Sequence, residues 1–318
     1  MLETNPQYLQ PDSDNKDYPL VSVIINCYNG ERYLREAIDS VRDQTYSNWE
    51  LIFWDNQSTD SSAEICQSYN DSRIHYFYAP EHTLLGCARN LAVEKAQGTW
   101  IAFLDCDDTW LTHKLEEQVK IVSEETDELG LVYTQAEIKF ESLKKSVFTS
   151  LLKYSRNTLP SGYNKFLPEG RVFDLLACGN FIPFSTVLIN RKFYLKVGGS
   201  NQKYRQAEDY DVCLKISAIA KLRALSAVHC YYRVHDLNLS HNQIEVGLIE
   251  WLDILRQFSN HRVYLTSVRS ANTRYAIYFL HQKQWRKGVE KLFRSGSLWI
   301  LSMIIFRKIW YSLTKVGF

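Results

Sequence analysis

Short apolar runs alternate with helical patterns through the first third of the chain, and this alternation constrains the fold more than any other feature. Runs with the length and residue types of strands lie at Val21–Ile25, Trp49–Trp54, Ile74–Tyr78 and Trp100–Leu104. Residues with helical spacing lie between them, at 31–44, 63–69 and 86–96. Strands that alternate with helices form crossover units, so the sequence predicts an α/β fold with a mostly parallel sheet flanked by helices.

The pattern is less regular after the fourth run. We expect a helix over 109–122, a β-pair over 131–148, a loop over 155–170, a helix over Phe173–Cys178, a strand over Ser185–Ile189, a helix over Glu208–Ala218 and a strand over Val228–Val234. Beyond about residue 242 the pattern is wholly helical. The chain therefore divides into a flexible lead (1–18), an α/β domain (19–241) and a helical C-terminal extension (242–318).

Charge and cysteine usage exclude several classes of protein. Lys and Arg number 37 against 36 Asp and Glu, and the basic residues concentrate near the C-terminus, so we expect no nucleic-acid partner. The seven cysteines form no C-x-x-C motif, which indicates reduced thiols in a cytoplasmic protein. The N-terminal residues lack the pattern of a signal peptide, and no apolar run approaches the ~20 residues that span a bilayer.

Carboxylates directly follow two of the predicted strands. Asp105, Asp107 and Asp108 come after the fourth run, and Asp55 comes after the second. In open α/β sheets the ligand binds beyond the carboxyl ends of the strands. Adjacent carboxylates repel one another unless a cation lies among them, and Mg²⁺ or Mn²⁺ binds through one or two carboxylates plus substrate phosphates. The cluster therefore indicates a site for a metal ion and a nucleoside diphosphate; the alternative is a solvated acidic turn that caps a helix.

Several motifs follow one another in an order that identifies a family. They are V-S-V-I-I-N-C-Y-N-G (21–30), Q-T-Y (44–46), D-N-Q-S-T-D (55–60), G-C-A-R-N (86–90), D-C-D-D (105–108), G-N-F-I-P (179–183), G-G (198–199), E-D-Y-D (208–211) and Y-R-V-H (232–235). Together they resemble the family 2 glycosyltransferases over about residues 19–240. The resemblance implies the GT-A fold, with its Rossmann-like sheet, and transfer of a sugar from a nucleotide-diphosphate donor with inversion.

The resemblance also implies roles around the donor's diphosphate. Asp107 matches the family's metal-binding acid, and Asp105 matches the acid near the ribose and the metal, which would be Mn²⁺ or Mg²⁺. That cation would neutralise charge that develops on the leaving diphosphate. His235 is a candidate metal or phosphate contact. Arg89 matches an arginine that pairs with the diphosphate, and the alternative is that it only bridges the acidic residues.

The residues that would face the nucleotide base depart from the family's usual pattern. Asp55 and Asn56 stand where the family often has two aspartates, and Asn26 begins a pair that replaces the commoner Pro-Thr. Tyr28 keeps an aromatic ring that can stack on the base. Because an Asn oxygen can accept the N3–H of uracil or thymine, we expect UDP or dTDP as the carrier.

Asp209 matches the family's general base, which would take the proton of the acceptor hydroxyl. The alternative is that Glu208 and Asp209 only favour the start of a helix through its dipole. Glu208 would position or bind the acceptor. Residues Asn180 to Ser185 match the acceptor-side wall, with packing as the alternative. Asp108 would contact the donor sugar or the metal. Trp110 and Arg233 would contact a sugar, with packing as the alternative for Trp110.

The last 36 residues, 283–318, combine eight Lys or Arg and one acid with Trp, Phe and Ile side chains. A basic aromatic segment too short to span a bilayer fits an interfacial helix on an anionic membrane surface. The alternative is a helix docked on the α/β domain with its cations in solvent. With the resemblance, this predicts a cytoplasmic enzyme, peripheral on the inner face of the cytoplasmic membrane, that acts on a glycan or lipid-linked acceptor.

Together these features predict a non-processive inverting glycosyltransferase of cell-surface polysaccharide synthesis. The Q-x-x-R-W motif of the processive synthases is not matched at 282–286. One alternative is a metal-dependent sugar nucleotidyltransferase, whose usual glycine-rich basic loop after the first strand has no counterpart here. Another is a catalytically inactive nucleotide-sugar binding module, which loss of Asp107 or Asp209 would favour, but both are present.

Overall fold

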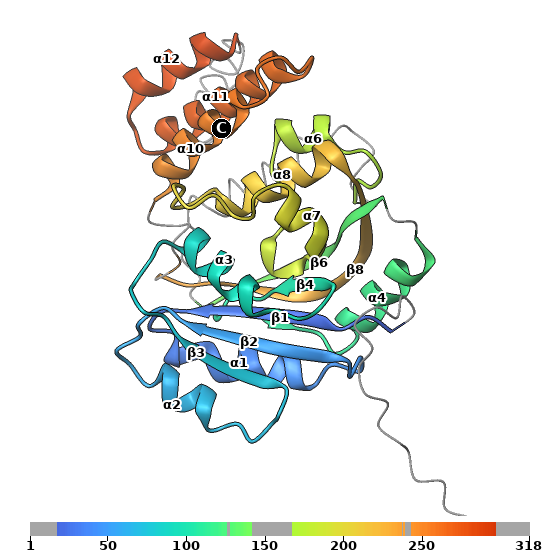
Figure 1. Ribbon diagram of the computed structural model, residues 1–318. Coiled ribbons are helices and arrows are strands. Elements are labelled where there is room, and N and C mark those ends of the chain that lie inside the picture. The colour runs from blue at the N-terminus through green and yellow to red at the C-terminus, as the bar shows by residue number, and fades with distance from the viewer. Residues whose placement is uncertain (1–17, 126–127, 142–166, 237, 239–242, 297–318) are drawn as a thin grey trace, which may run out of the picture. The chain divides into compact units, whose positions relative to one another are not determined.

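The computed structural model describes residues 18–125, 128–141, 167–236, 238 and 243–296 (Figure 1). These residues form two compact units. The first unit comprises the described residues up to Glu141, residues 167–172 and Ile182–His235. The second unit comprises Phe173–Phe181 and the described residues from Asp236 onward. The predicted flexible lead lies outside the described residues apart from Tyr18, as does most of the loop predicted over 155–170.

An eight-stranded mixed sheet forms the centre of the first unit. Its strands are β1 (Val21–Cys27), β2 (Trp49–Asp55), β3 (Ile74–Tyr78), β4 (Trp100–Phe103), β5 (Thr109–Trp110), β6 (Leu129–Phe140), β7 (Leu188–Asn190) and β8 (Lys221–Val234). Their order is β3-β2-β1-β4-β7-β6-β8-β5. The first four strands are parallel, as predicted, and β6 is parallel to β8. Strand β7 runs antiparallel to β4 and β6, and β5 runs antiparallel to β8.

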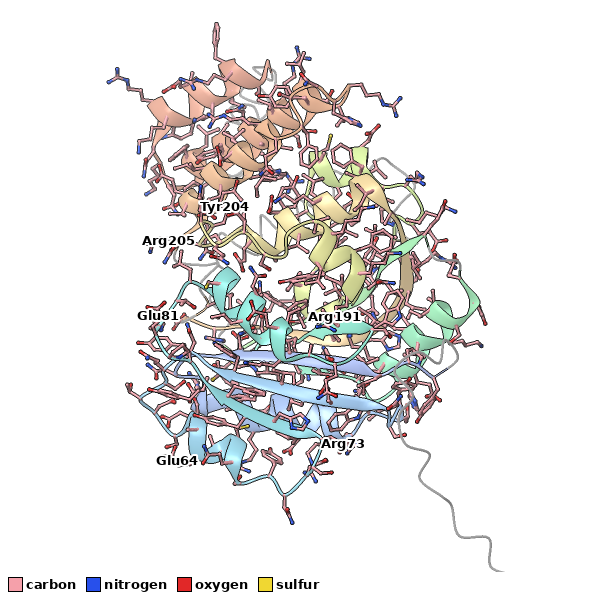
Figure 2. All side chains as sticks on the ribbon, viewed as in Figure 1. Glu64, Arg73, Glu81, Arg191, Tyr204 and Arg205 are labelled. Carbon is pink, nitrogen blue, oxygen red and sulfur yellow. The ribbon has the colours of Figure 1, made fainter. Side chains whose placement is uncertain are left out.

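Helices cover both faces of this sheet (Figure 1). The first unit holds α1 (Glu31–Arg42), α2 (Ser62–Gln67), α3 (Leu85–Lys95), α4 (Lys114–Glu124), the 3₁₀ helix η1 (Phe184–Thr186), α7 (Arg191–Lys196) and α8 (Glu208–Ile219). Helices α1 and α2 lie on one face, and α3 and α8 lie on the other (Figure 1). Side chains fill the space between sheet and helices, whereas Glu64 and Glu81 point into solvent (Figure 2).

The second unit is helical where it is described. It contains α6 (Phe173–Cys178), α10 (Ile244–Arg256), α11 (Tyr264–His281) and α12 (Trp285–Ser295). The predicted helical pattern beyond residue 242 is therefore confirmed as far as residue 296. Among the residues that the structure describes, no helix has both the length and the apolar character needed to cross a membrane.

Several predicted elements were wrong in part. The strand predicted over Val228–Val234 begins earlier, at Lys221, because residues from 221 onward already pair with β6. The helix predicted over 109–122 begins only at Lys114, because Thr109 and Trp110 form β5 and pair with β8. The predicted β-pair over 131–148 is a single strand up to Phe140, whose partners are the distant β7 and β8; residues 142–148 lie outside the described part. The strand predicted from Ser185 begins at Leu188, because η1 precedes it.

The buried central strands determine the edge of the sheet at which the predicted acidic residues lie. Strand β2 is buried at every position and β1 at nearly every one, as expected for strands covered by helices on both faces. Apolar residues of α1 pack against them at the predicted helical spacing. Because β2 and β4 both pair in parallel with β1, their carboxyl ends emerge at the same edge, where the predicted acidic residues follow.

Candidate active site

The acidic loop, residues Asp105–Asp108, lies between β4 and β5 and is held to the far end of β8. His235 Nε2 lies 3.0 Å from Asp107 Oδ2, and the imidazole is buried beside the ring of Tyr33, 4.9 Å away between centroids. Two residues predicted from separate motifs therefore meet. The contact ties the Asp107 carboxylate to the residue that follows β8.

Asp108 is the most buried acid of the loop. Its Oδ2 accepts a hydrogen bond from the Ser185 hydroxyl at 2.5 Å, and its Oδ1 accepts one from the backbone N–H of Arg233 at 2.9 Å. Burial, reinforced by the carboxylates of Asp107 and Asp105, raises the pKa of Asp108 well above its ordinary value. Asp108 therefore holds the loop in shape, and the sugar contact assigned to it stays a prediction.

Arg233 makes a second clamp on the same loop. Its Nε donates to the carbonyl oxygen of Asp107 at 2.9 Å, and its Nη2 donates to Glu36 of α1 at 2.6 Å. The guanidinium also lies 4.5 Å from the ring centroid of Tyr33. Arg233 thus ties the acidic loop to α1, and its sugar contact is likewise untested.

Arg89 joins the acidic loop to the start of α8. Only 3% of its side chain is exposed, and it lies against the ring of Phe184, 4.4 Å from the centroid. Its Nη1 donates to Glu208 Oε1 at 2.6 Å, and its Nη2 donates to Asp105 Oδ1 at 2.9 Å. The sequence allowed two interpretations of Arg89, and this geometry agrees with the one in which it bridges carboxylates. The contact with a diphosphate stays a prediction.

Two of the three acids in the first turn of α8 have raised pKa values. Burial raises the pKa of Glu208 to about 7 and that of Asp209 to about 6, while the positive charge of Arg89 opposes both shifts. Asp209 Oδ1 accepts the N–H of Tyr210 at 2.6 Å. A carboxyl group with a pKa near 6 is mostly ionised at neutral pH yet remains basic enough to take a proton, which suits a general base.

The predicted base-facing residues Asp55 and Asn56 are engaged within the protein. Asp55 accepts the N–H of Ser58 and the hydroxyl of Tyr76, each at 2.7 Å. The buried Asn56 amide donates to the carbonyl of Thr83 at 2.8 Å and accepts its N–H at 3.2 Å. These contacts shape the loops around the ends of β2 and β3. A direct contact of either side chain with the base stays a prediction.

Two groups at this end of the sheet remain available to a ligand. Tyr28 is 53% exposed, and its ring lies 4.4 Å from that of His82. Asn26 Nδ2 is buried, and among the described residues it finds no hydrogen-bond acceptor. A buried donor without a partner needs an explanation, and a bound ligand is one. Sequence reasoning missed His82, because only the folded loop brings it beside Tyr28.

Trp110 and Asn180 have different settings. Trp110 is only 4% exposed; its Nε1–H donates to the Ser185 carbonyl at 2.7 Å. The Trp110 side chain is packed inside the protein, which was the alternative stated from sequence. Its contact with a sugar stays a prediction. Asn180 is partly buried in the second unit. The sequence analysis placed Ser185 only in the acceptor-side wall, because nothing near it in the chain marks it as the partner of an acid 77 residues away.

A divalent cation fits the acidic loop only in company with a substrate. Among the described residues, no three His, Cys, Asp or Glu side chains are close enough to hold a metal, so Asp105, Asp107 and His235 do not form a closed ligand set. Asp105 and Asp107 nevertheless keep partly exposed carboxylates. Mg²⁺ and Mn²⁺ usually take one or two protein carboxylates and complete their shell with phosphates and water. The donor set therefore suits a cation shared with a diphosphate.

Solved structures of similar fold were found at low sequence identity. S. aureus TarS 1–349 in complex with UDP-GlcNAc matches with a TM-score of 0.58 and 16% identity, covering 87% of this chain and 92% of that one. The mannosyltransferase PcManGT from Pyrobaculum calidifontis, in complex with GDP-Man and Mn²⁺, gives the same score and identity over 93% and 91%. These likenesses confirm the predicted glycosyltransferase fold.

Sequence comparison goes further than the fold. Residues 22–175 match the family model described as Glycosyl transferase family 2. TuaG of Bacillus subtilis, a glycosyltransferase named for teichuronic acid biosynthesis, is 31% identical over 240 residues, which cover 73% of this chain and 86% of TuaG. WfaP of Escherichia coli, named a UDP-Glc:alpha-D-GlcNAc-diphosphoundecaprenol beta-1,3-glucosyltransferase, is 31% identical over 77% of this chain and 90% of its own. With the acidic loop and the Glu208–Asp209 pair in place, the chain belongs to the family 2 glycosyltransferases.

Proposed function

We propose that this glycosyltransferase moves one sugar, with inversion, from a UDP- or dTDP-sugar to a hydroxyl of a glycan or lipid-linked acceptor in cell-surface polysaccharide synthesis. The observation that carries the proposal is the bridge from Asp105 through Arg89 to Glu208, which joins the acidic loop to the neighbour of the candidate base, Asp209. The names of TuaG and WfaP support a cell-surface product, and that of WfaP supports a lipid-linked acceptor.

Asp105 and Asp107 would hold a Mn²⁺ or Mg²⁺ ion against the donor's diphosphate. When bound, the ion would supply Lewis-acid neutralisation of the leaving group's charge. His235 would orient the Asp107 carboxylate through the 3.0 Å contact. Arg233 and Ser185 would keep the loop backbone in place, so that the carboxylates need little rearrangement when the donor arrives.

Asp209 would take the proton from the acceptor hydroxyl as that oxygen attacks the anomeric carbon. One base is enough for direct displacement, and no second carboxylate is needed as a nucleophile, which fits inversion. The pKa of about 6 keeps Asp209 ionised at neutral pH. Arg89 would hold Glu208 beside it and set the charge that both acids experience.

We also propose that residues 283–318 lie on an anionic membrane surface at the cytoplasmic face. On α12, Trp285 and Phe293 are 40% and 72% exposed. They stand eight residues apart, which places them on one face of a helix. Arg286, Lys287 and Arg294 of the same helix are exposed as well. Exposed aromatics among cations are typical of interfacial helices; residues 297–318 lie outside the described part.

Calorimetry on the full chain tests the donor assignment. UDP, dTDP and GDP are titrated with and without Mn²⁺ into the wild type, Asp107→Ala and, as a matched control, the exposed Asp43→Ala. We expect Mn²⁺-dependent binding of UDP or dTDP by the wild type and the control, and its loss in Asp107→Ala. Absence of binding by folded wild type would overturn the proposal, and the anomeric configuration of the product, read by NMR, decides inversion.

A further inference from the structure

Lys114, at the start of α4, is completely buried. Burial lowers the pKa of its amine to about 7. Among the described residues, no carboxylate lies within ion-pair distance of it. Instead Nζ donates to Gln118 Oε1 at 2.8 Å and lies 3.9 Å from the ring centroid of Trp110. A methionine would fill this space without the cost of burying an amine, so the amine calls for another explanation.

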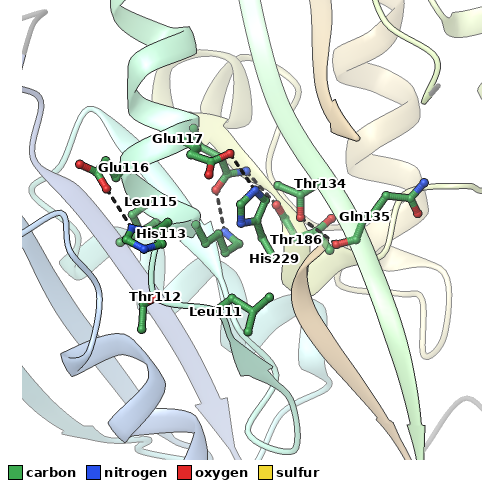
Figure 3. Close-up of polar contacts among 12 residues, drawn as sticks. Leu111, Thr112, His113, Leu115, Glu116, Glu117, Thr134, Gln135, Thr186 and His229 are labelled. Atoms are coloured by element: carbon green, nitrogen blue, oxygen red, sulfur yellow. Dashed lines mark hydrogen bonds and ion pairs between the residues drawn. The ribbon is translucent and has the colours of Figure 1, made fainter. Parts of the chain in front are cut away.

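Both partners of Lys114 lead to the same short helix. Trp110 Nε1 donates to the carbonyl of Ser185, and Gln118 Nε2 donates to the carbonyl of Thr186 at 2.9 Å. Figure 3 shows Thr186 beside Thr134 and His229, among the polar side chains next to α4. Because Lys114 Nζ donates to the Oε1 end of the Gln118 amide, the Nε2 end is turned toward η1.

Helix η1 in turn holds both ends of the acidic loop. The Ser185 hydroxyl donates to Asp108 Oδ2 and accepts the backbone N–H of Asp105 at 3.2 Å. We propose that Lys114 is a positioning residue, which acts through Trp110 and Gln118 on η1 and thereby fixes the acidic loop for the donor's diphosphate. The last step rests on the proposed function, whereas the mechanical link from Lys114 to the loop does not.

Hydrogen–deuterium exchange on the full chain tests that link without any ligand. In Lys114→Met, the amides of Asp105 and of η1 should exchange about tenfold faster than in the wild type. The reason is that Gln118 and Trp110, which bond to η1, lose their contacts with the Lys114 amine. Lys120→Met, an exposed lysine on the same helix, is the matched control and should exchange like the wild type. Unchanged exchange at these amides in Lys114→Met would overturn the inference.

A second variant separates positioning from general stability. Lys114→Met leaves the Gln118 oxygen unpaired, and Lys114→Met/Gln118→Met removes that oxygen. The Thr186 carbonyl loses its donor in the double variant, so the thermal midpoint should recover in part. We still expect fast exchange of the loop and Mn²⁺-dependent UDP binding at least about tenfold weaker than in the wild type, since small misplacements are costly. Recovery of loop protection together with the midpoint would refute a positioning role. Loop effects without nucleotide binding by the wild type would instead contradict only the proposed function.

Discussion

Replacing Arg89 by methionine should disturb stability and the pH profile of transfer at the same time. The arginine is almost fully buried, and it is the direct hydrogen-bonding partner of the buried Glu208 and of Asp105. Breaking a buried pair by removing one partner costs about 3–5 kcal/mol, because the remaining charge is left uncompensated. For a chain of this size that corresponds to a fall in the melting midpoint on the order of 10 °C.

The pH profile responds for a related reason. The charge of Arg89 lowers the pKa of Asp209 against the effect of burial, so its removal moves that pKa upward from about 6. A general base works in its ionised form, and the acid limb of kcat/KM should therefore shift to higher pH in Arg89→Met. Denaturant unfolding and pH-dependent initial rates measure the two effects.

Two further variants sharpen this prediction. Arg89→Lys keeps the charge but loses the planar fork that reaches two carboxylates, so its pH limb should move less than that of Arg89→Met. Arg89→Met/Glu208→Gln removes the uncompensated charge and should regain much of the lost stability. If Arg89→Met unfolds within about 0.5 kcal/mol of the wild type and keeps the same acid limb, the reasoning from the bridge is refuted.

Other predictions concern the base, a turn and the C-terminal helix. Asp209→Asn should bind donor like the wild type but lower kcat by about 10²-fold or more, and equal turnover in steady-state assays would exclude Asp209 as the base. Gly199→Ala should destabilise more than Gly198→Ala: both glycines have positive φ, but only at 199 would the new Cβ meet a side-chain oxygen at 2.4 Å. Chemical denaturation compares the two, and equal losses would mean that backbone strain alone matters. Trp285→Ser/Phe293→Ser should reduce flotation of the full chain with phosphatidylglycerol vesicles, and undiminished flotation would contradict membrane docking through α12.

The parallel half of the sheet could be predicted because its signals are local. Each of β1 to β4 is an apolar run bounded by polar turn residues, and each helix between them shows its own spacing. Strand β5 could not be predicted in this way. It has two residues and no period of its own, and it exists because Tyr231 and Cys230 pair with it from more than 100 residues away.

The candidate site likewise has features that local sequence predicts and features that only distant contacts decide. Acids at strand ends are visible in the sequence, and the structure brings Asp105 and Glu208 together through Arg89. Whether a side chain faces a ligand or the protein is decided by distant contacts, which is why Trp110 and Asn56 read from sequence as candidate contacts and are in fact engaged inside the fold. Ser185 and Lys114 carry no local signal of their importance.

The strands near the end of the α/β domain affect when, during folding, the enzyme becomes able to bind its donor. Strand β2 pairs with β1 and β3, its neighbours in the chain, so that part of the sheet can form early, whereas closing β8 onto the loop requires contacts between residues far apart. The hydrogen bond from Arg233 to Asp108 spans 125 residues. A nascent chain that ends before β8 would hold every acid of the loop without the clamps that shape it. Competence to bind donor should therefore appear during refolding as one of the last events, after most of the helical signal has returned.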